Sequence, residues 1–217
     1  MINTRVTVPD ERGLSLLLLG AHCDDIEMGC GGTLLKWTDE YRINNITWIV
    51  FTSNEIRKDE AIASANEFLH AVPKADINVF DYKDGYLPAS WSKVKDEFEN
   101  IKEYTEPDII FTHYRNDLHQ DHRLINELTW NTFRDHLIYE YEIVKYDGDL
   151  GNPNCFVPLD KEYANKKKEY ILRNFKSQLQ KQWFDDTLLT SIMRIRGVEC
   201  AAEAKYAEAF YSRKMVL

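Results

Sequence analysis

Two short segments of the sequence concentrate the side chains that could do chemistry. The first, residues 22–27, reads HCDDIE and is followed by Gly29, Gly31 and Gly32. The second, residues 113–122, reads HYRNDLHQDH and holds three of the six histidines of the chain. Imidazoles and carboxylates at this density are typical of a metal centre or an acid–base site rather than of an ordinary surface loop.

A divalent metal explains the mixture of imidazoles and carboxylates. Catalytic zinc usually has three protein ligands and one open position, and His22, Asp25 and His122 would supply two imidazoles and one carboxylate. The same ligand types also suit iron(II) and other divalent metals. A bound metal lowers the pKa of water to about 7, and a free carboxylate beside it can accept the water's proton. A histidine held by a neighbouring carboxylate can stabilise an oxyanion or protonate a leaving amine.

Each segment also has a simpler interpretation. A glycine-rich turn after a strand can bind nucleotide phosphates, but residues 29–32 read GCGG and form neither GxGxxG nor GxxxxGK[ST]. Asp24 and Asp25 would also place two negative charges where a pyrophosphate should lie. In the second segment Asp121 can cap a helix, which does not account for the histidines. A nucleotide-binding module and a metal-stabilised binding protein remain alternatives to an enzyme.

The apolar runs of the sequence predict the strands that must position these segments. Leu14–Leu19 and Ile46–Thr52 are continuous apolar runs, typical of strands buried on both faces. Three weaker runs follow at residues 77–80, 108–112 and 142–146. Both His- and Asp-rich segments therefore come directly after a predicted strand.

Segments with helical periodicity lie between these runs, at residues 61–69, 91–101 and 124–137. Alternation of strands and helices predicts an α/β fold, a Rossmann-like three-layer sandwich with a mostly parallel sheet. The carboxyl ends of parallel strands meet at one edge of the sheet, where ligands bind. We therefore expect residues 22–27 and 113–122 to face each other across one crevice.

The last third of the chain has a different pattern. A polar loop at residues 149–158 precedes one long predicted helix at 161–183 and a second helix that begins at Asp185 or Asp186. The tail from Tyr206 is expected to return as a strand or to cover the site.

The length and composition fit one domain. The chain has 217 residues, of which 44% are hydrophobic and 29% charged, as in ordinary globular proteins. The prediction is a single domain over residues 1–217, with C-terminal helices at about residues 161–196 packed on it.

Charge and cysteine content exclude several classes. The net charge of −9 argues against a nucleic-acid or anionic-membrane binder, since phosphate binding needs a basic surface. No apolar run is long enough to cross a bilayer, and the start does not resemble a signal peptide. The four cysteines form no CxxC pair and are expected to be free thiols, which predicts a cytoplasmic protein.

The two segments carry a resemblance to a known family. Residues 21–32, AHCDDIEMGCGG, resemble the AHPDDxE…GG motif of the PIG-L/LmbE-like zinc-dependent N-deacetylases. Residues 113–122 resemble the second motif of that family, HxxxDxHxDH. One departure is Cys23, which stands where the family usually has proline. It is expected to alter the stiffness of the turn more than the chemistry.

Weaker matches extend the resemblance to the C-terminus. DGYL at residues 84–87 resembles the DGxL element, and Arg57 with Glu60 resembles the RxxE segment. Arg-Gly at 196–197, followed by YAEAF at 206–210, resembles the RG…YAEAF ending of the family.

The resemblance implies roles for the residues of the site. His22, Asp25 and His122 would be the zinc ligands, and Asp24 would be the general base.

His119 would stabilise or protonate the tetrahedral intermediate, with Asp121 orienting it, and Arg57 and Asp84 would hold sugar hydroxyls. The resemblance leaves open the roles of four further motif residues: His113, Asp117, Glu27 and Glu208.

The predicted function is that of a metal-dependent hydrolase. It would remove the N-acetyl group from an N-acetylated amino sugar or its conjugate and release acetate. The predicted cofactor is Zn²⁺, with Fe²⁺ or another divalent metal as an alternative. The substrate would be a small molecule or glycoconjugate, and a homo-oligomer is compatible with the sequence. A hydrolase of another amide or ester is an alternative, because the site chemistry is not specific for sugars.

Overall fold

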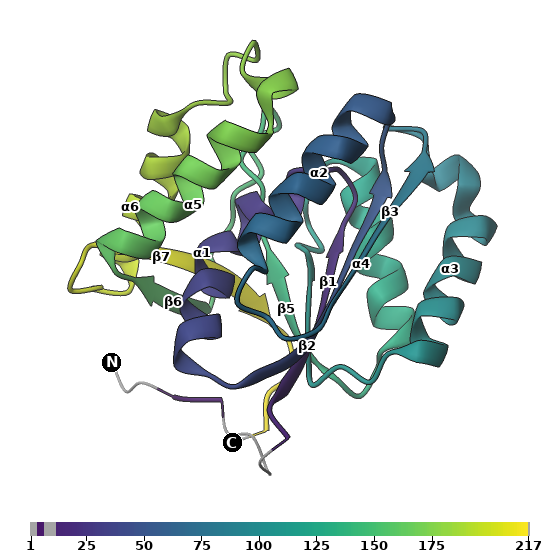
Figure 1. Cartoon of the computed structure of the whole chain (residues 1–217), viewed down its shortest axis with the longest axis horizontal. Coiled ribbons are helices and arrows are strands. Elements are labelled where there is room, and N and C mark those ends of the chain that lie inside the picture. Colours follow the sequence, from purple (N-terminus) through teal and green to yellow (C-terminus); the bar gives the residue numbers. More distant parts are fainter. Residues whose placement is uncertain (1–3, 7–11, 217) are drawn as a thin grey trace.

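The computed structural model describes residues 4–6 and 12–216, so residues 1–3, 7–11 and 217 of the predicted domain lie outside it. A seven-stranded sheet with the order β3-β2-β1-β4-β5-β7-β6 forms its centre (Figure 1). The strands are β1 (Leu14–Gly20), β2 (Ile43–Thr52), β3 (Ala75–Tyr82), β4 (Ile109–His113), β5 (Leu137–Tyr141), β6 (Cys155–Leu159) and β7 (Tyr206–Ser212).

The first five strands are parallel, which confirms the predicted mostly parallel sheet. β1 lies between β2 and β4, with Leu18 paired to Trp48 on one side and to Phe111 on the other. These central strands carry apolar side chains on both faces because helices cover both faces. The carboxyl ends of β1 and β4 are therefore neighbours at one edge of the sheet.

Helices form the two outer layers of the molecule. In Figure 1, α3 and α4 lie on one side of the sheet, and α1, α2 and α5 lie on the other. Two apolar cores result: Leu17 and Leu19 of β1 pack towards α3 and α4, whereas Leu16 and Leu18 pack towards α1 and α2. The α-helices are α1 (Asp25–Glu40), α2 (Glu55–Phe68), α3 (Trp91–Tyr104), α4 (Gln120–Thr132), α5 (Lys161–Asn174) and α6 (Asp186–Glu199).

Three expectations for the middle of the chain were wrong. The fifth strand is Leu137–Tyr141 and not 142–146, and the helix before it ends at Thr132. Residues 137–141 alternate as a strand beside β4, with Ile109 paired to Leu137, so Leu137 belongs to the sheet rather than to the helical face. The predicted polar loop at 149–158 likewise contains β6, which pairs antiparallel with β7.

The long helix predicted over 161–183 is also shorter than expected. α5 ends at Asn174, and a single 3₁₀ turn, Lys176–Gln178, follows it. The carboxylate of Glu60 in α2 accepts hydrogen bonds from the backbone N–H and the hydroxyl of Ser177, at 2.8 and 2.6 Å. This contact draws the chain out of the helical path. The second helix starts as predicted, because Asp185 caps it by accepting from the N–H of Leu188.

Gly197 of α6 lies against the chain that leads into β7. A Cβ atom there would lie 2.3 Å from the carbonyl oxygen of Lys205, and backbone cannot swing aside as a side chain can. We expect the steric clash in Gly197→Ala to destabilise the fold by roughly 1–3 kcal/mol. This loss outweighs the gain of about 1 kcal/mol that alanine offers over glycine as a helix former. Urea denaturation measures this loss. Val198→Ala, an exposed position in the same helix, should change stability by less than about 0.5 kcal/mol.

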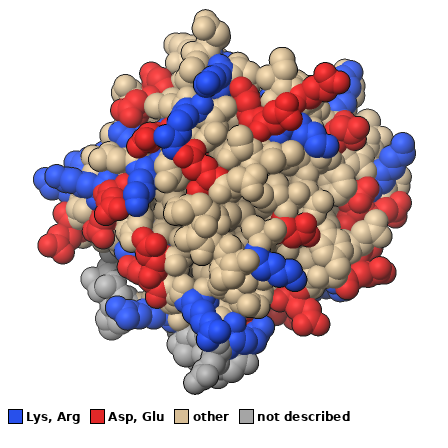
Figure 2. Space-filling model, in the orientation of Figure 1, with Lys and Arg blue, Asp and Glu red and all other residues tan. Residues whose placement is uncertain are grey.

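The surface carries both signs of charge. Figure 2 shows acidic and basic side chains interspersed around the margin of the face that it displays. Among the described residues, no helix is both long enough and apolar enough to cross a membrane.

Candidate metal centre

Three side chains from the two predicted segments converge on one point. His22 follows β1, Asp25 begins α1, and His122 lies in the first turn of α4. The Nδ1 atom of His22 is 3.0 Å from Nε2 of His122 and 3.2 Å from Oδ2 of Asp25. The distance from Nε2 of His122 to the same carboxylate oxygen is 3.5 Å.

These separations match the spacing of ligands around a metal. Two ligand atoms each about 2.0–2.1 Å from a tetrahedral zinc lie about 3.3 Å from each other. The two imidazole nitrogens and the carboxylate oxygen therefore fit a single zinc ion with little movement. Three overlapping sets also have donor atoms within 4.8 Å of one another: His22 with His119 and His122, Asp25 with His113 and His122, and His22 with Asp84 and Asp121.

Carboxylates on the outer side of the two rings indicate which nitrogen faces the centre. Nδ1 of His122 lies 2.9 Å from Oδ2 of Asp117, and donation there leaves the lone pair of Nε2 directed inward. Nε2 of His22 lies 3.1 Å from Asp84 and 3.4 Å from Asp121, so its other nitrogen, Nδ1, is directed inward. A carboxylate behind each ligating imidazole is the usual arrangement of metal-binding histidines.

The local turn brings His22 and Asp25 together. The backbone N–H of His22 donates to Oδ2 of Asp25 at 2.6 Å, which closes a tight turn between β1 and α1. His113, at the end of β4, lies against the same carboxylate: its Nε2 accepts the backbone N–H of Ala21 at 2.9 Å and lies 3.2 Å from Oδ2 of Asp25. The ring of His113 also stacks on that of His122, with centroids 3.9 Å apart. His113 thus contacts two of the three predicted ligands, Asp25 and His122.

The electrostatics of the centre favour a cation. Burial alone would lower the pKa of His22, but the carboxylates of Asp25, Asp121 and Asp84 outweigh it and hold that pKa well above its usual value. Burial would raise the pKa of Asp25, yet the surrounding histidines hold it well below the usual range. Burial lowers the pKa of His122 to about 3, which keeps this imidazole neutral and able to bind a metal.

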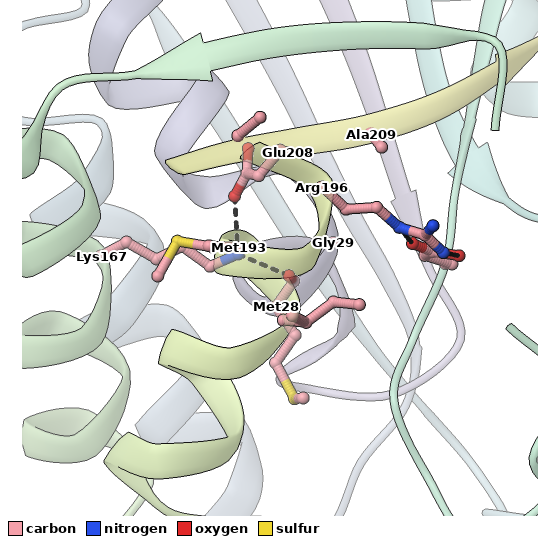
Figure 3. A pocket seen from close by; sticks show the side chains of 10 residues that line it. Met28, Gly29, Lys167, Met193, Arg196, Glu208 and Ala209 are labelled. Carbon is pink, nitrogen blue, oxygen red and sulfur yellow. Dashed lines mark hydrogen bonds and ion pairs between the residues drawn. The ribbon is translucent and has the colours of Figure 1, made fainter. Parts of the chain in front are cut away.

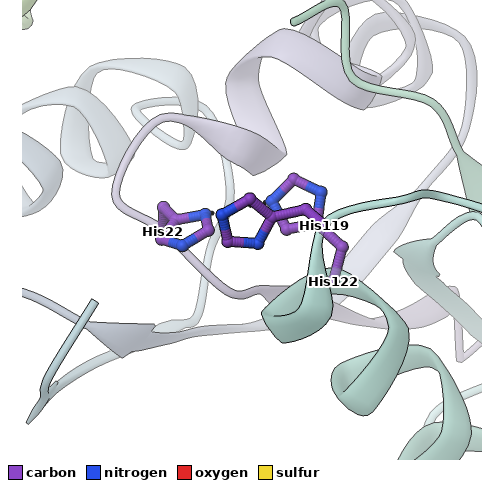
Figure 4. Close-up of side chains that lie close together, drawn as sticks. All are labelled: His22, His119 and His122. Atoms are coloured by element: carbon purple, nitrogen blue, oxygen red, sulfur yellow. Dashed lines mark hydrogen bonds between the residues drawn. The ribbon is translucent and has the colours of Figure 1, made fainter. Parts of the chain in front are cut away.

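His119 stands beside the three predicted ligands, as Figure 4 shows. Its ring centroid is 4.7 Å from that of His22 and 4.6 Å from that of His122. It is the N-cap of α4, and its Nδ1 accepts the backbone N–H of Asp121 at 3.3 Å. The neutral ring therefore carries its proton on Nε2. Burial and the nearby His22 lower the pKa of His119. The imidazole of His119 is therefore neutral near neutral pH.

Asp121 has other partners than expected. Its carboxylate accepts the backbone N–H groups of Gly85 and Leu87 at 2.7 and 3.1 Å. It thus fixes the turn after β3 beside His22, and the orientation of His119 comes from the backbone of Asp121 instead of from its carboxylate.

The predicted base and the predicted sugar-binding residues lie together. Nη2 of Arg57 donates to Oδ1 of Asp24 at 2.7 Å, and Nη1 lies 3.9 Å from Oδ2 of Asp84. Arg57 is placed at the start of α2, where Asn54 caps the helix by accepting its N–H. Asp84 is exposed, and its hydrogen bond with His22 lowers its pKa to about 2. Asp84 is therefore a carboxylate at the mouth of the site.

Cys23 points away from the centre. Its thiol donates to the carbonyl of Thr52 at 3.3 Å, and burial raises its pKa to about 12. It stays a thiol and takes the structural place of the family's proline. Glu27 is fully buried in the first turn of α1, where it packs beneath the site.

The sequence did not reveal a lysine behind the second segment. Nζ of Lys145 lies 3.0 Å from Oδ2 of Asp117, the partner of His122, and 2.5 Å from Asp149. Asp149 in turn accepts the N–H of Leu118 at 2.7 Å. Lys145 and Asp149 lie in the loop after β5, and this loop reaches the site because β5 is next to β4. The misplaced fifth strand concealed that signal.

The glycines after Asp25 serve packing. A Cβ atom at Gly29 would lie 2.3 Å from the ring of Tyr141, and one at Gly31 would lie 2.7 Å from Phe68. Both glycines let α1 approach its neighbours closely, so their absence of a side chain is explained by packing.

Comparison with protein families gives one match. A sequence model of the PIG-L family, described as GlcNAc-PI de-N-acetylase, matches residues 17–133, more than half of the chain.

Solved structures share the fold at low sequence identity. N,N'-diacetylchitobiose deacetylase from Pyrococcus horikoshii is 21% identical, with a TM-score of 0.72 over 92% of this chain and 84% of that one. The zinc-inhibited form of teicoplanin deacetylase Orf2 is 14% identical, with a TM-score of 0.69 over 91% and 97%. GalB, a 4-carboxy-2-hydroxymuconate hydratase from Pseudomonas putida KT2440, is 17% identical, with a TM-score of 0.71 over 94% and 98%. Because a hydratase shares the fold, the fold alone does not decide the reaction.

Proposed function

This chain belongs to the PIG-L family, and on that premise we propose that it is a metal-dependent N-deacetylase. The substrate is an N-acetylated amino sugar or a conjugate of one, and the products are acetate and the free amine. The observation that carries the proposal is the trio of donor atoms of His22, Asp25 and His122, spaced 3.0 to 3.5 Å apart.

Zn²⁺ is the metal that we propose for this trio. Two imidazoles and one carboxylate with a fourth position open to water are typical of catalytic zinc, and Fe²⁺ is the alternative that the ligand types allow. When bound, such a cation polarises a carbonyl oxygen and makes water acidic enough to lose a proton near neutral pH.

Asp24 is the residue that we propose as general base. Its carboxylate is nearly buried beside Asp25, but it is not one of the three converging donors. The hydrogen bond from Arg57 to Oδ1 fixes its position and leaves Oδ2 to accept a proton from the attacking water. The proton can then pass to the amine nitrogen as the carbon–nitrogen bond breaks.

His119 complements Asp24 from the opposite segment. Because its Nδ1 accepts a backbone N–H, the Nε2–H of the neutral ring is free to donate a hydrogen bond. A donor placed beside the ligands can stabilise the oxyanion that forms when water adds to the acetyl carbonyl. His119 is half-exposed, so substrate can reach it.

The sugar is proposed to lie over the turn after β3. Asp84 and Arg57 offer an acceptor and a donor group, which suits hydroxyls that both donate and accept. Tyr86, exposed in the same turn, can pack on the apolar face of a pyranose. The activity named for the structurally similar N,N'-diacetylchitobiose deacetylase supports an acetylated sugar over other amides. A cytoplasmic location and a homo-oligomeric state also remain predictions.

The proposal is tested by metal analysis and acetate release on the same preparation. We expect about one zinc per chain and release of acetate from at least one N-acetylhexosamine conjugate, with removal of the metal by a chelator abolishing release. The panel should contain N-acetyl sugars, acetyl-lysine peptides and acetyl esters. A higher kcat/KM on the peptides or esters would replace the sugar assignment by the other amide or ester hydrolase. Absence of both metal and acetate release would refute the deacetylase.

A further inference from the structure

A buried ion pair lies outside the metal centre, between two elements that contribute no residue to it. Lys167 of α5 and Glu208 of β7 are 1% and 4% exposed, and Nζ of the lysine is 2.6 Å from Oε1 of the glutamate. A buried pair loses the hydration of two charges, so it is seldom the most stabilising choice at its position. Its presence calls for a role other than stability.

The pair contacts backbone groups in the middle of α1. Glu208 accepts the N–H groups of Gly32 and Thr33 at 2.8 and 2.6 Å. Lys167 donates to the carbonyl of Met28 at 2.6 Å (Figure 3). The i→i−4 pattern of the α-helix pairs the N–H of Gly32 with that same carbonyl of Met28, and α1 is helical from Asp25 to Glu40. The two charged side chains therefore contact the donor and the acceptor of one position of the helical ladder.

The glycines of this helix make the approach possible. A Cβ atom at Gly32 would lie 2.6 Å from the side chain of Leu159 and 3.1 Å from Oε1 of Glu208. Any larger residue at Gly32 would press on the carboxylate and push it away from the backbone. This contact accounts for the second half of GCGG, and for the glutamate of YAEAF, which the catalytic proposal does not use.

The segment between the ion pair and the metal centre is very short. Met28 follows Asp25 by three residues, less than one helical turn, and its own N–H donates to the carbonyl of Asp24 at 3.0 Å. One end of this turn is held at the metal centre by the bond from the N–H of His22 to Asp25. The other end is held by Lys167. The direction of the turn sets where the carboxylates of Asp24 and Asp25 point.

We propose that Lys167 and Glu208 are positioning residues that hold the first turn of α1 so that Asp25 meets the two histidines. The inference rests on the proposed function, since it takes the trio as the metal site. It assigns to α5 and β7 a part in catalysis although neither touches the reacting groups.

Paired variants separate this role from a purely structural one. Removing one charge would leave the other buried without a partner, so both residues are changed together. Lys167→Met with Glu208→Gln keeps a carbonyl for the N–H of Gly32 or Thr33 and an amide that can donate to Met28. Lys167→Met with Glu208→Leu has similar volume and removes every hydrogen bond from these two side chains to the backbone of α1.

The readouts are the zinc dissociation constant of the metal-free protein, by chelator competition, together with kcat and the melting temperature. We expect the Met/Leu variant to bind zinc about 10-fold or more weakly, as when groups behind metal ligands are lost. Its kcat should fall as well, while the Met/Gln variant stays within about 3-fold of the starting protein in zinc binding. Equal zinc affinities for the two folded variants would overturn the inference, even if both melted at a lower temperature.

Gly32→Ala provides a second test if the Met/Leu variant does not fold. It keeps both charges, and its Cβ presses on the carboxylate of Glu208 and on the side chain of Leu159, so weaker zinc binding is again expected. A folded Gly32→Ala protein with unchanged zinc affinity would refute the positioning role. Failure of the unmodified protein to bind zinc or release acetate would instead refute the proposed function, so the two failures are distinguishable.

Discussion

Replacing Asp24 by Asn is expected to lower kcat by about 10²–10⁴-fold, the usual contribution of a general base, and to leave metal binding intact. The carboxamide has nearly the shape of the carboxylate and can still accept the hydrogen bond from Arg57. It cannot take a proton from water. Asp25 keeps its three histidine contacts, because none of them passes through Asp24.

The measurement is single-substrate kinetics combined with metal analysis of the same sample. Asp59→Asn is the matched control, since Asp59 is an exposed carboxylate of α2, the helix that carries Arg57. It should leave kcat and zinc content unchanged. An Asp24→Asn protein that retains most of its kcat would show that the base lies elsewhere, with His119 the next candidate. One that loses its zinc would show that Asp24 is a ligand.

Local sequence signals were sufficient to predict the sheet and the convergence of the site. Continuous apolar runs such as Leu14–Leu19 identify strands buried on both faces, and a parallel sheet brings their carboxyl ends to one edge. Residues 22–27 and 113–122 meet there because β1 and β4 are adjacent. This adjacency follows from the strand order, which periodicity alone does not determine.

The sequence was less informative where two patterns overlap or a partner is distant. Leu137 fits both the apolar face of α4 and the start of β5, and only pairing with Ile109 decides between them. The partners of Asp121 are backbone groups of a distant turn, and backbone groups leave no trace in the pattern of side chains. Lys167 stands in a run of three lysines that reads as a solvated face, yet it alone is fully buried.

Replacing His122 by Ala is expected to remove the metal and with it all measurable acetate release. The variant keeps only two of the three proposed ligands, His22 and Asp25. Loss of a group behind a ligand already weakens metal binding by up to about 100-fold, so loss of the ligand itself should weaken zinc binding by at least that factor. The fold should survive, because the cores on both faces of the sheet do not include this histidine. Some stability will be lost, since His122 is buried and stacked on His113.

Zinc-dependent stability gives a readout that does not depend on turnover. A ligand that binds only the folded state stabilises it by about 2.7 kcal/mol when its free concentration is 100 times the dissociation constant. Added zinc should therefore raise the melting temperature of the metal-free protein and fail to raise that of His122→Ala. His70→Ala, which removes an exposed histidine at the end of α2, should respond to zinc as the unmodified protein does. If His122→Ala retained one zinc per chain and the same rise in melting temperature, His122 would not be a ligand, and the set formed by His22, Asp84 and Asp121 would become the candidate site.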